Sequence, residues 1–570
     1  MKLDDGSQVA VIGGGPAGTF FSYFLLQLAQ RVDLDLKVDI FEPKDFSQTG
    51  PAGCNMCGGI ISETLLQNLA AEGIHLPQEV VQRSIDSYLL HMDVGSVRIA
   101  TPLKEKRIAA VHRGAGPRGV KETDYRSFDG YLLELAVEKG ARIIHERVVQ
   151  IAWDNGRPRI STKEGRNETY DLLIVSTGLN TSALKLFDDL GIPYKPPKST
   201  RTYICEFYLG RDIIRRYLGY SAHFFLLNIP RLEFAALIPK GNYVTVCLLG
   251  KDIDKDLVNT FLYSPRVKQC MPPHWQAPED ICHCSPVINI QSALQPFADR
   301  IVFIGDSGTS RLYKDGLGAA YRTAKAAATT AVLYGISAKD FQQKYWPTCK
   351  NIIKDNRLGK LVFWVTDQIK KWKFTQQGVW RMVSREQKKE SGPKRMSTVL
   401  WDTFTGSAPY KSVFMRTLHP AFGIRLLLDI AAGKWPFKFE KKKVRILMDT
   451  SAIGKTYRDG EVIVRQGDVG EYMYIIQSGQ VEVVQRKEEK EFCLAVLEKG
   501  DFFGEMAIFE KKPHPASIHA LGEARVLTLE KKSLLQRIHE DPSLALKIME
   551  KMAHRIRELE LALIRHTSTL

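Results

Sequence analysis

The segment QVAVIGGGPAG, residues 8–18, decides the fold of the N-terminal part of this chain. Its first five residues form a short apolar strand, and residues 16–31 have the pattern of a helix. Between them, Gly13, Gly15 and Gly18 occupy the three positions of a G-x-G-x-x-G turn. Glycines in such a turn allow bare backbone to approach a pyrophosphate at the N-terminus of a helix.

A second strand, residues 37–41, completes a βαβ unit and leads directly into Glu42. An acidic side chain at this place accepts hydrogen bonds from the hydroxyls of a ribose, so the sequence predicts a bound dinucleotide. The segments DLLIV at residues 171–175 and IVFI at residues 301–304, which are apolar apart from Asp171, are typical of central parallel strands. We therefore expect an α/β domain of the Rossmann type.

A second glycine-rich turn follows the strand at residues 301–304. It begins with Gly305 and Asp306 and continues to Gly316 and Gly318, which open an alanine-rich helix. Here the sequence resembles the flavoprotein group that includes geranylgeranyl reductases, aromatic hydroxylases and flavin halogenases. The resemblance implies FAD as the cofactor, with Asp306 on its ribitol chain and the glycine-rich helix start facing the flavin ring.

Three shorter segments resemble the geranylgeranyl reductase branch in particular. Cys57 begins a Cys-Gly-Gly segment, Arg126 begins Arg-Ser-Phe-Asp, and Lys240 lies in Ile-Pro-Lys-Gly. The resemblance, which covers about residues 8–430, implies Cys57 and Lys240 as catalytic residues and Arg126 as a cofactor-binding residue.

The sequence departs from its relatives at two places. The substrate-pocket motif has two aromatic residues where this chain has Phe234 and Ala236, which implies a reshaped pocket. The hydroxylase branch has Asp-Gly after the strand that ends at Val175, whereas this chain has Ser-Thr-Gly at residues 176–178. The second departure disfavours hydroxylase-type handling of NADPH.

By resemblance, the expected reaction is reduction of carbon–carbon double bonds in an isoprenoid or similar lipid, with hydride delivered by reduced FAD. NADPH and ferredoxin are the expected candidates for the electron donor. The first alternative is a flavin monooxygenase or halogenase. The second comes from a different class, a sensor in which bound flavin and nucleotide report a state without turnover.

Changes in composition and in the spacing of apolar residues and glycines along the chain predict four regions. Short runs rich in apolar and β-branched residues at 190–290 predict an antiparallel-sheet substrate domain. It is inserted into the FAD-binding domain, which we assign to residues 1–189 and 291–335. Residues 336–445 are helical in pattern, basic and aromatic. Residues 446–570 contain short strands between glycine turns and end in an amphipathic helix, which predicts a C-terminal β-roll.

The segment 339–445 contains 24 Lys and Arg against 8 Asp and Glu, which accounts for the whole net charge of +16. It also holds six of the eight tryptophans. Cations interleaved with aromatic rings, as at residues 370–374 and 434–443, suit an anionic membrane surface. We expect no nucleic acid, because no recognised nucleic-acid module accompanies the patch. A helical subdomain with tryptophans in its core is the structural alternative.

Nine cysteines in 570 residues predict a reducing compartment rather than a disulfide framework. No apolar run reaches the length of a membrane-spanning helix, and the N-terminus lacks the apolar run of a signal peptide. We expect a cytoplasmic protein, peripheral on the inner face of the membrane. The clusters at residues 54–57 and 282–284 give no convincing zinc-ligand spacing, so we expect no metal.

Residues 457–560 resemble the cyclic-nucleotide-binding domains of catabolite activator protein and of cyclic-nucleotide-dependent kinases. The matching segments include GDFFGEMA at residues 500–507. The resemblance implies that the backbone amides of Gly504 and Ala507 bind the cyclic phosphate and that Glu505 binds the ribose 2′-hydroxyl.

The most telling departure lies in the segment PHPAS, residues 513–517, where nucleotide-binding relatives have Pro-Arg-Ala-Ala and then Thr or Ser. His514 therefore replaces the arginine that pairs with the phosphate, while Ser517 keeps a hydroxyl. Loss of a charged hydrogen bond costs about 1.5–3 kcal/mol. We expect weak or absent binding of cyclic AMP and cyclic GMP. The domain would then be a degenerate regulatory or dimerisation module, with the helix at about 542–566 as a homodimer contact.

Overall fold

The computed structural model describes residues 1–570 except 102, 104, 121–125, 180, 280, 390–391, 433–451, 488–489 and 568–570. The chain forms two compact units. Unit 1 comprises Met1–Thr64, Gln78–Thr101 and Ile108–Ser451, and unit 2 comprises Leu65–Pro77, Pro102–Arg107 and Ala452–Leu570. Unit 2 therefore includes two segments that are remote in sequence from its main part.

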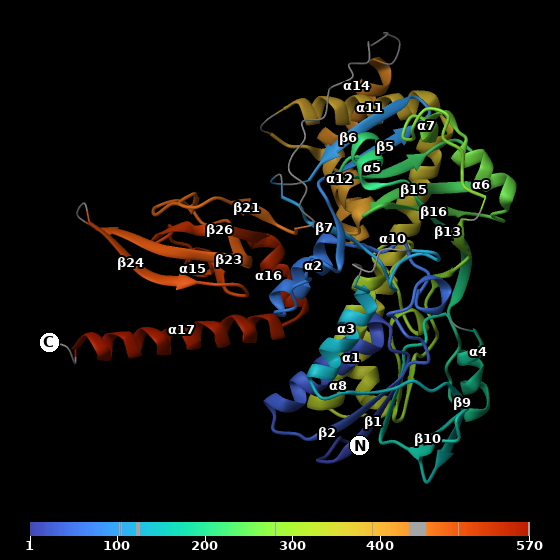
Figure 1. Ribbon diagram of the computed structural model, residues 1–570, viewed down its shortest axis with the longest axis vertical. Coiled ribbons are helices and arrows are strands. Elements are labelled where there is room, and N and C mark those ends of the chain that lie inside the picture. The colour runs from blue at the N-terminus through green and yellow to red at the C-terminus, as the bar shows by residue number, and fades with distance from the viewer. Residues whose placement is uncertain are drawn as a thin grey trace. The chain divides into compact units, whose positions relative to one another are not determined.

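A six-stranded sheet in unit 1 confirms the predicted Rossmann-type fold (Figure 1). All neighbouring strands in it are parallel except the edge pair β19–β20. Helices α1 (Pro16–Arg31) and α8 (Gly316–Leu333) pack together through edge-to-face contacts of Phe20 and Phe24 with Tyr321. In order, the strands are β19 (Phe297–Ala298), β20 (Ile301–Phe303), β12 (Leu172–Val175), β1 (Ser7–Ile12), β2 (Leu36–Phe41) and β8 (Arg142–Ile144).

Unit 1 also contains an eight-stranded sheet, which is mixed because β5 and β14 pair in parallel while the other pairs are antiparallel. The expected hairpin is formed by β15 and β16. The strands are β17 (Cys282–Cys284), β13 (Lys198–Tyr208), β16 (Tyr243–Gly250), β15 (Leu232–Lys240), β14 (Ser221–Leu226), β5 (Ser87–Met92) and β6 (Gly95–Ala100), with β18 (Val287–Gln291) paired to β13.

Smaller elements complete this part of unit 1. Two three-stranded sheets consist of β3 (Ile60–Ile61), β7 (Ile108–Val111) and β4 (Val81–Ile85), and of β9 (Val148–Asp154), β10 (Arg157–Thr162) and β11 (Asn167–Thr169). The further helices are α3 (Phe128–Glu138), α4 (Thr181–Leu184), α5 (Arg211–Tyr217), α6 (Lys255–Leu262) and α7 (Pro265–Lys268).

Each face of the eight-stranded sheet covers its own apolar core, since successive side chains of a strand point to opposite faces. Phe224 belongs to the core shared with helices α11 to α14, and its neighbour Phe225 belongs to the core shared with α5, α6 and α7. The helical part predicted from the sequence consists of α9 (Ala338–Asp340), α10 (Trp346–Lys371), α11 (Lys373–Lys388), α12 (Arg395–Thr405), α13 (Tyr410–Thr417) and α14 (Pro420–Ala431).

The tryptophans of this helical part divide between core and surface. Trp401 is buried and donates to Glu63, and Trp380 donates to the backbone of Ser96. Trp364 and Trp372 are 60% and 57% exposed. The basic segment 434–443 lies outside the described residues. Among the helices that are described, none is both long and apolar enough to cross a membrane.

Unit 2 is the predicted β-roll, built around the antiparallel pair β23–β26. Its elements are β21 (Lys455–Tyr457), β22 (Val462–Val464), β23 (Tyr472–Lys487), β24 (Lys490–Leu497), β25 (Phe502–Phe503), β26 (Ser517–Glu530), α15 (Glu505–Glu510), α16 (Lys531–Glu540) and α17 (Ser543–Thr567). The helix α2 (Glu63–Ala71) supplies Gln67, which donates to the Thr528 carbonyl, and Glu105 accepts from the Thr528 amide. Two remote segments thus hydrogen-bond to β26.

Candidate functional site

The predicted glycine turn joins β1 to α1. A Cβ on Gly13 would lie 2.6 Å from the Ser176 carbonyl oxygen, and one on Gly18 would lie 2.0 Å from the Gly13 oxygen. Both glycines are therefore required by the packing of the turn itself. A Cβ on Gly15 would meet only Asn55 Nδ2, at 3.5 Å. In the described part of the chain, the space beside Gly15 at the N-terminus of α1 is therefore open.

Glu42 follows β2 and lies against this turn. Its carboxylate accepts hydrogen bonds from the backbone amides of Gly14 and Lys44, at 2.8 and 2.9 Å. Burial raises the pKa of Glu42, while these two hydrogen bonds and the Lys44 charge oppose the rise. The carboxylate thus stands where the sequence predicts a ribose contact.

The second glycine motif packs directly on the first. Gly305 has a φ of +59°, and a Cβ on it would lie 2.8 Å from the Cβ of Ala17 in α1. Its amide donates to Thr323 in α8 at 3.0 Å. Burial raises the pKa of the next residue, Asp306, against a hydrogen bond from Ser310 and the charge of an arginine. Gly305 therefore belongs with the first turn, although nearly 300 residues separate them.

Helix α8 begins at Gly316, directly after Asp315, whose φ is +58°. A Cβ on Gly318 would lie 2.4 Å from the Asp315 carboxylate, which also accepts a hydrogen bond from Ser62 at 2.7 Å. Gly318 is therefore needed for the Asp315 contacts. Among the described residues, a Cβ on Gly316 would meet only Ser310 Oγ at 3.6 Å, so the first turn of α8 also leaves open space.

The sequence did not indicate the role of Arg113, the arginine beside Asp306. Its buried guanidinium forms a two-pronged ion pair with Asp129, with Nη2 to Oδ2 at 2.9 Å. It also hydrogen-bonds to Cys57 and interacts electrostatically with Asp306. The signal that could have revealed it is the polar pair His112-Arg113 directly after the buried strand β7.

Arg126, the arginine that the family resemblance implied, lies elsewhere. Its side chain is 44% exposed, forms an ion pair with Glu134 on α3, and lies over the ring of Tyr131 at 5.3 Å. The structure therefore joins Arg113, rather than Arg126, to Cys57 and the second glycine motif.

A pocket in unit 1 brings the two predicted catalytic residues together. Cys57 and Lys240 both line it. So do both cysteine clusters and several charged side chains. Its wall includes Cys54, Met56, Cys57, His112, Arg113, Ile204, Glu206, Lys240, Cys282, His283 and Cys284.

A buried ion pair forms one wall of this pocket. Lys240, which is 1% exposed, donates from Nζ to Glu206 Oε1 at 2.9 Å. Burial alone would raise the pKa of Glu206, but Lys240, His112 and a hydrogen bond from Thr245 lower it to about 2. Burial lowers the pKa of His112 to about 4. At neutral pH the wall therefore holds an ionised carboxylate beside a neutral imidazole.

A second lysine, Lys314, lies in the loop before α8 and was not expected to be functional. Its ammonium lies 4.6 and 4.2 Å from the ring centres of Phe224 and Phe234. Burial lowers the pKa of Lys314 to about 8, and Cys247 partly opposes the shift. A Cβ on Gly58 would lie 2.9 Å from the Cys247 sulfur, so this lysine belongs to the same neighbourhood as the Cys-Gly-Gly segment.

In unit 2, Glu505 is the residue that the sequence predicts to bind a ribose hydroxyl. This side chain is 3% exposed, and its Oε1 pairs with Arg555 of α17 at 3.1 Å. Arg555 also donates to the Phe502 carbonyl and lies over the Phe502 ring. In the described part of the chain nothing donates to the other oxygen, the buried Glu505 Oε2. A ribose hydroxyl would satisfy it.

His514 follows Glu505 by nine residues in the sequence and is 8% exposed. Its amide donates to the Asp468 carbonyl at 2.9 Å, and Ser517 Oγ accepts from the Gln466 amide at 3.0 Å. A Cβ on Gly470 would meet both Ala507 Cβ at 2.3 Å and His514 Nε2 at 3.1 Å. His514 and Ala507 therefore flank the same glycine.

The backbone at Gly504 and the pKa of His514 are further features of this part of unit 2. Gly504, before α15, has a φ of +84°, and a Cβ on it would lie 2.7 Å from the Tyr472 carbonyl oxygen. Only glycine fits there. Burial lowers the pKa of His514, with Asp468 opposing the shift.

Known proteins share both parts of this chain. Residues 454–541 match the family model of the cyclic nucleotide-binding domain. The chain is 40% identical over 96 residues to the cAMP-dependent protein kinase regulatory subunit of Blastocladiella emersonii, which is 17% of this chain and 23% of that protein. It spans about a fifth of the length of the kinase regulatory subunits that it matches. Unit 2 therefore carries a cyclic nucleotide-binding domain.

Solved structures share the remaining fold. A flavoprotein/dehydrogenase from Cytophaga hutchinsonii has 14% identity and a TM-score of 0.51, over 76% of this chain and 100% of that one. A geranylgeranyl bacteriochlorophyll reductase-like protein from Thermoplasma acidophilum has 14% identity and a TM-score of 0.43, over 75% and 97%. At the higher score the likeness shows the fold of a flavoprotein.

Proposed function

We propose that this chain is an FAD-dependent reductase that saturates carbon–carbon double bonds of an isoprenoid or other lipid. The observation that carries the proposal is the pocket in which Cys57 and the Lys240–Glu206 pair meet Arg113. Arg113 also interacts with Asp306 of the second glycine motif, which connects the pocket to the proposed cofactor site.

The residues present fit FAD. Gly15 and Gly316 leave open space at the starts of α1 and α8, where backbone amides favour an anionic or polar ligand. Glu42 would hold the ribose, and Asp306 the ribitol chain. When bound, FAD supplies the hydride that adds to one carbon of the double bond. NADPH or ferredoxin is proposed as the electron donor.

Reduction also requires a proton on the second carbon, and the pocket contains groups that can supply it. Cys57 would deliver the proton from Sγ, and the hydrogen bond from Arg113 would stabilise the thiolate that remains. Lys240 Nζ lies beside Gly59, where a Cβ would be 2.8 Å away, and can return a proton to this end of the pocket. Glu206 holds the ammonium in place.

Product analysis tests the proposal. Purified protein, loaded with FAD and reduced without oxygen, should convert a geranylgeranyl lipid into a product heavier by two hydrogen atoms per reduced bond, as measured by mass spectrometry. Cys57→Ala should slow this conversion, while Cys493→Ala, at an exposed cysteine of unit 2, should not. A hydroxylated or halogenated product in the presence of oxygen and halide would instead identify the monooxygenase or halogenase alternative. Tight FAD binding without turnover of any kind would favour a sensor.

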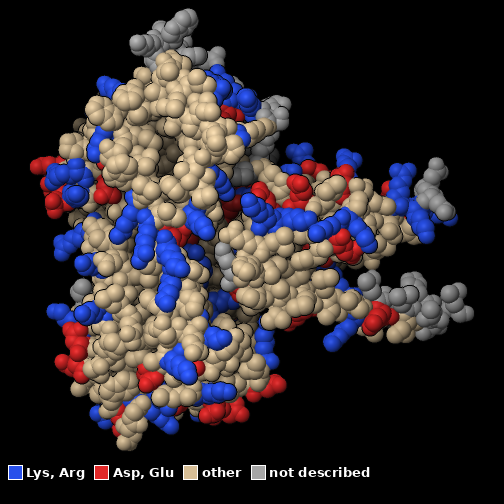
Figure 2. Space-filling view, turned by 180° about the vertical axis from the view of Figure 1, so that it is seen from behind, with Lys and Arg blue, Asp and Glu red and all other residues tan. Residues whose placement is uncertain are grey.

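An enzyme that acts on a lipid needs access to a membrane, and the helical part of unit 1 has exposed apolar side chains that could provide it. Ile424, Leu427 and Leu428 of α14 follow a helical i, i+3, i+4 spacing and are each more than half exposed. Trp364 of α10 and Phe374 of α11 are also exposed. In Figure 2 the middle of the upper end of unit 1 is mainly uncharged, with Lys and Arg side chains at its sides. We propose that this surface rests on the inner face of an anionic membrane, assisted by the basic segment 434–443.

Liposome sedimentation tests this surface. The protein should sediment with anionic vesicles at low salt and be released by high salt, because exposed charges are screened within about 8 Å at physiological ionic strength. Leu427→Glu should weaken sedimentation, and deletion of residues 434–443 should do so as well. Leu333→Glu, at an exposed leucine of α8, is the matched control. Equal binding to neutral and anionic vesicles would contradict the role of charge.

For unit 2 we propose a degenerate regulatory or dimerisation role with weak binding of cyclic nucleotides. Leu546, Met549 and Ile556 on α17 are each more than half exposed. Their spacing of three and seven residues places them on one stripe of the helix, which suits pairing with α17 of a second copy. The homodimer contact expected from the sequence would lie along this stripe.

A further inference from the structure

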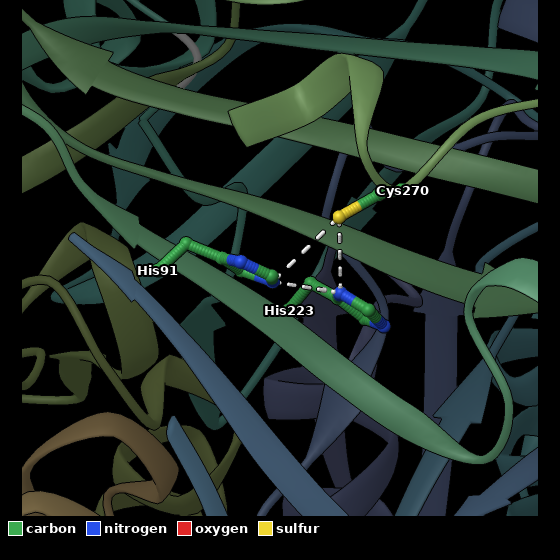
Figure 3. A group of neighbouring side chains, drawn as sticks. All are labelled: His91, His223 and Cys270. Carbon is green, nitrogen blue, oxygen red and sulfur yellow. Dashed lines mark hydrogen bonds between the residues drawn. The ribbon is translucent and has the colours of Figure 1, made fainter. Parts of the chain in front are cut away.

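Three side chains with metal-binding atoms meet in the core of unit 1, away from the pocket. His91 on β5 and His223 on β14 face Cys270, which lies just after α7 (Figure 3). All three are buried. In the described part of the chain, this is the one group in which three histidine, cysteine or carboxylate ligand atoms lie within 4.8 Å of one another.

The spacing of these atoms is close to that of ligands around one tetrahedral ion. The Cys270 sulfur lies 3.7 Å from His91 Nε2 and 3.6 Å from His223 Nδ1. Bonds of about 2.0–2.1 Å to nitrogen and about 2.3 Å to sulfur give nitrogen–sulfur separations of about 3.6 Å in a tetrahedral zinc site. The two nitrogens, 2.9 Å apart, would open to about 3.4 Å. A half-ångström adjustment of the rings would suffice.

In each histidine, the ring nitrogen that does not face Cys270 has a hydrogen-bond partner. Metal-bound histidines usually donate this second N–H to a protein group in the same way. His223 Nε2 lies 2.9 Å from the Leu218 carbonyl oxygen, which can only accept a hydrogen bond. A neutral His223 ring therefore directs the lone pair of Nδ1 at the cluster. His91 Nδ1 lies 2.7 Å from Ser96 Oγ, and the His91 ring stacks on Phe225.

The position of the cluster indicates what an ion would do there. On β13, Cys205 and Phe207 belong to the core that contains Cys270, whereas Glu206 lines the pocket on the opposite face. An ion at the cluster would be separated by the sheet from the substrate pocket. It would link β5, β14 and the segment after α7, and the Arg266 carbonyl oxygen, 3.4 Å from the Cys270 sulfur, is a candidate fourth ligand.

We propose that His91, His223 and Cys270 bind one structural Zn²⁺ ion that fixes the α6–α7 segment to the eight-stranded sheet. Two imidazoles and one thiolate are ligands that suit zinc. With the Arg266 carbonyl oxygen as fourth ligand, the buried set would have no open position, as in a structural site. The proposal is independent of the flavin reaction, since it concerns a different core and requires no turnover.

Metal analysis of the full chain tests the proposal. Protein purified without a metal-affinity tag from zinc-supplemented cells should contain about one zinc per chain by elemental mass spectrometry, as one closed site requires. Cys270→Ala and His223→Ala should each reduce the zinc content at least tenfold. Cys205→Ala removes another buried cysteine of the same core and should leave the zinc in place. The double change of Cys282 and Cys284 to alanine should also leave the zinc content unchanged. This result would show that the zinc is not held by the cysteines of the pocket.

A second measurement covers the case in which the variants do not fold. Unfolding the unmodified protein in the presence of a chromogenic chelator should release about one equivalent of zinc, because ligands are lost with the fold. Cobalt should replace zinc and give a thiolate-to-metal absorption band that Cys270→Ala lacks. Zinc-free protein that takes up neither ion would overturn the proposal and leave the cluster as a hydrogen-bonded core. Stoichiometric copper in place of zinc would overturn the assignment of the ion.

Discussion

Changing Gly15 to valine is expected to abolish FAD binding while the protein stays folded. Among the described residues, only Asn55 Nδ2 lies within 4 Å of a Cβ added at Gly15, so this Cβ makes no clash. It would instead occupy the place where the pyrophosphate must approach the start of α1. We expect a loss of affinity of about 100-fold or more, equivalent to about 3 kcal/mol. Absorbance of the bound flavin after gel filtration measures it.

Gly15 and Gly18 belong to one motif but differ in how closely their neighbours pack, so substitutions at the two positions test different things. Gly18→Val would place its side chain against the Gly13 oxygen and Ser176, so loss of flavin there would report misfolding. Gly423→Val is the matched control, because Gly423 also lies in the first turns of a helix, and no described residue lies within 4 Å of a Cβ added there. A Gly15→Val protein that is as yellow as the unmodified one would refute the assignment of the cofactor site.

Changing His514 to arginine is expected to strengthen binding of cyclic AMP by about 10- to 100-fold. Arginine would restore a charged hydrogen bond to the phosphate, worth about 1.5–3 kcal/mol. The remaining site supports this gain, because Glu505 Oε2 is buried without a donor in the described chain and Gly470 separates His514 from Ala507. Isothermal calorimetry measures the change. No gain would show that the pocket has been lost more widely than at His514.

The pH dependence of the unmodified protein provides a second readout. Only the imidazolium form of His514 favours a phosphate, and burial lowers the pKa of His514 below the ordinary value of 6.5. Affinity for cyclic AMP should therefore be low and flat above about pH 6.5 and rise as the pH falls below it. This window lies below the range of roughly 6 to 8 expected from a free histidine. The His514→Arg protein should show no such rise, and submicromolar binding by the unmodified protein at pH 8 would contradict this account.

The N-terminal fold was predictable because its signals are local. The strand at residues 8–12, the helix at 16–31 and the acidic residue at 42 each follow from short-range patterns, and all three appear in the structure. The β-roll was predictable for the same reason, since its glycine turns fix strand ends one by one. In contrast, the sequence could not show that β5 and β6 join a sheet whose other strands begin more than 100 residues later.

For the functional sites too, the sequence reveals local features, and the tertiary structure decides the long-range ones. The sequence by itself determined which residue types could do chemistry: the glycine turns, Glu42, Asp306, Cys57, Lys240 and the change of arginine to His514. Only the tertiary structure decided their partners, because burial and hydrogen bonding arise between segments that are distant in the chain. It paired Lys240 with Glu206, placed Arg113 rather than Arg126 beside Cys57, and brought His91, His223 and Cys270 together from three separate elements. The spacing of these residues along the chain does not predict their contact, because the contact depends on which strands pair and in which register.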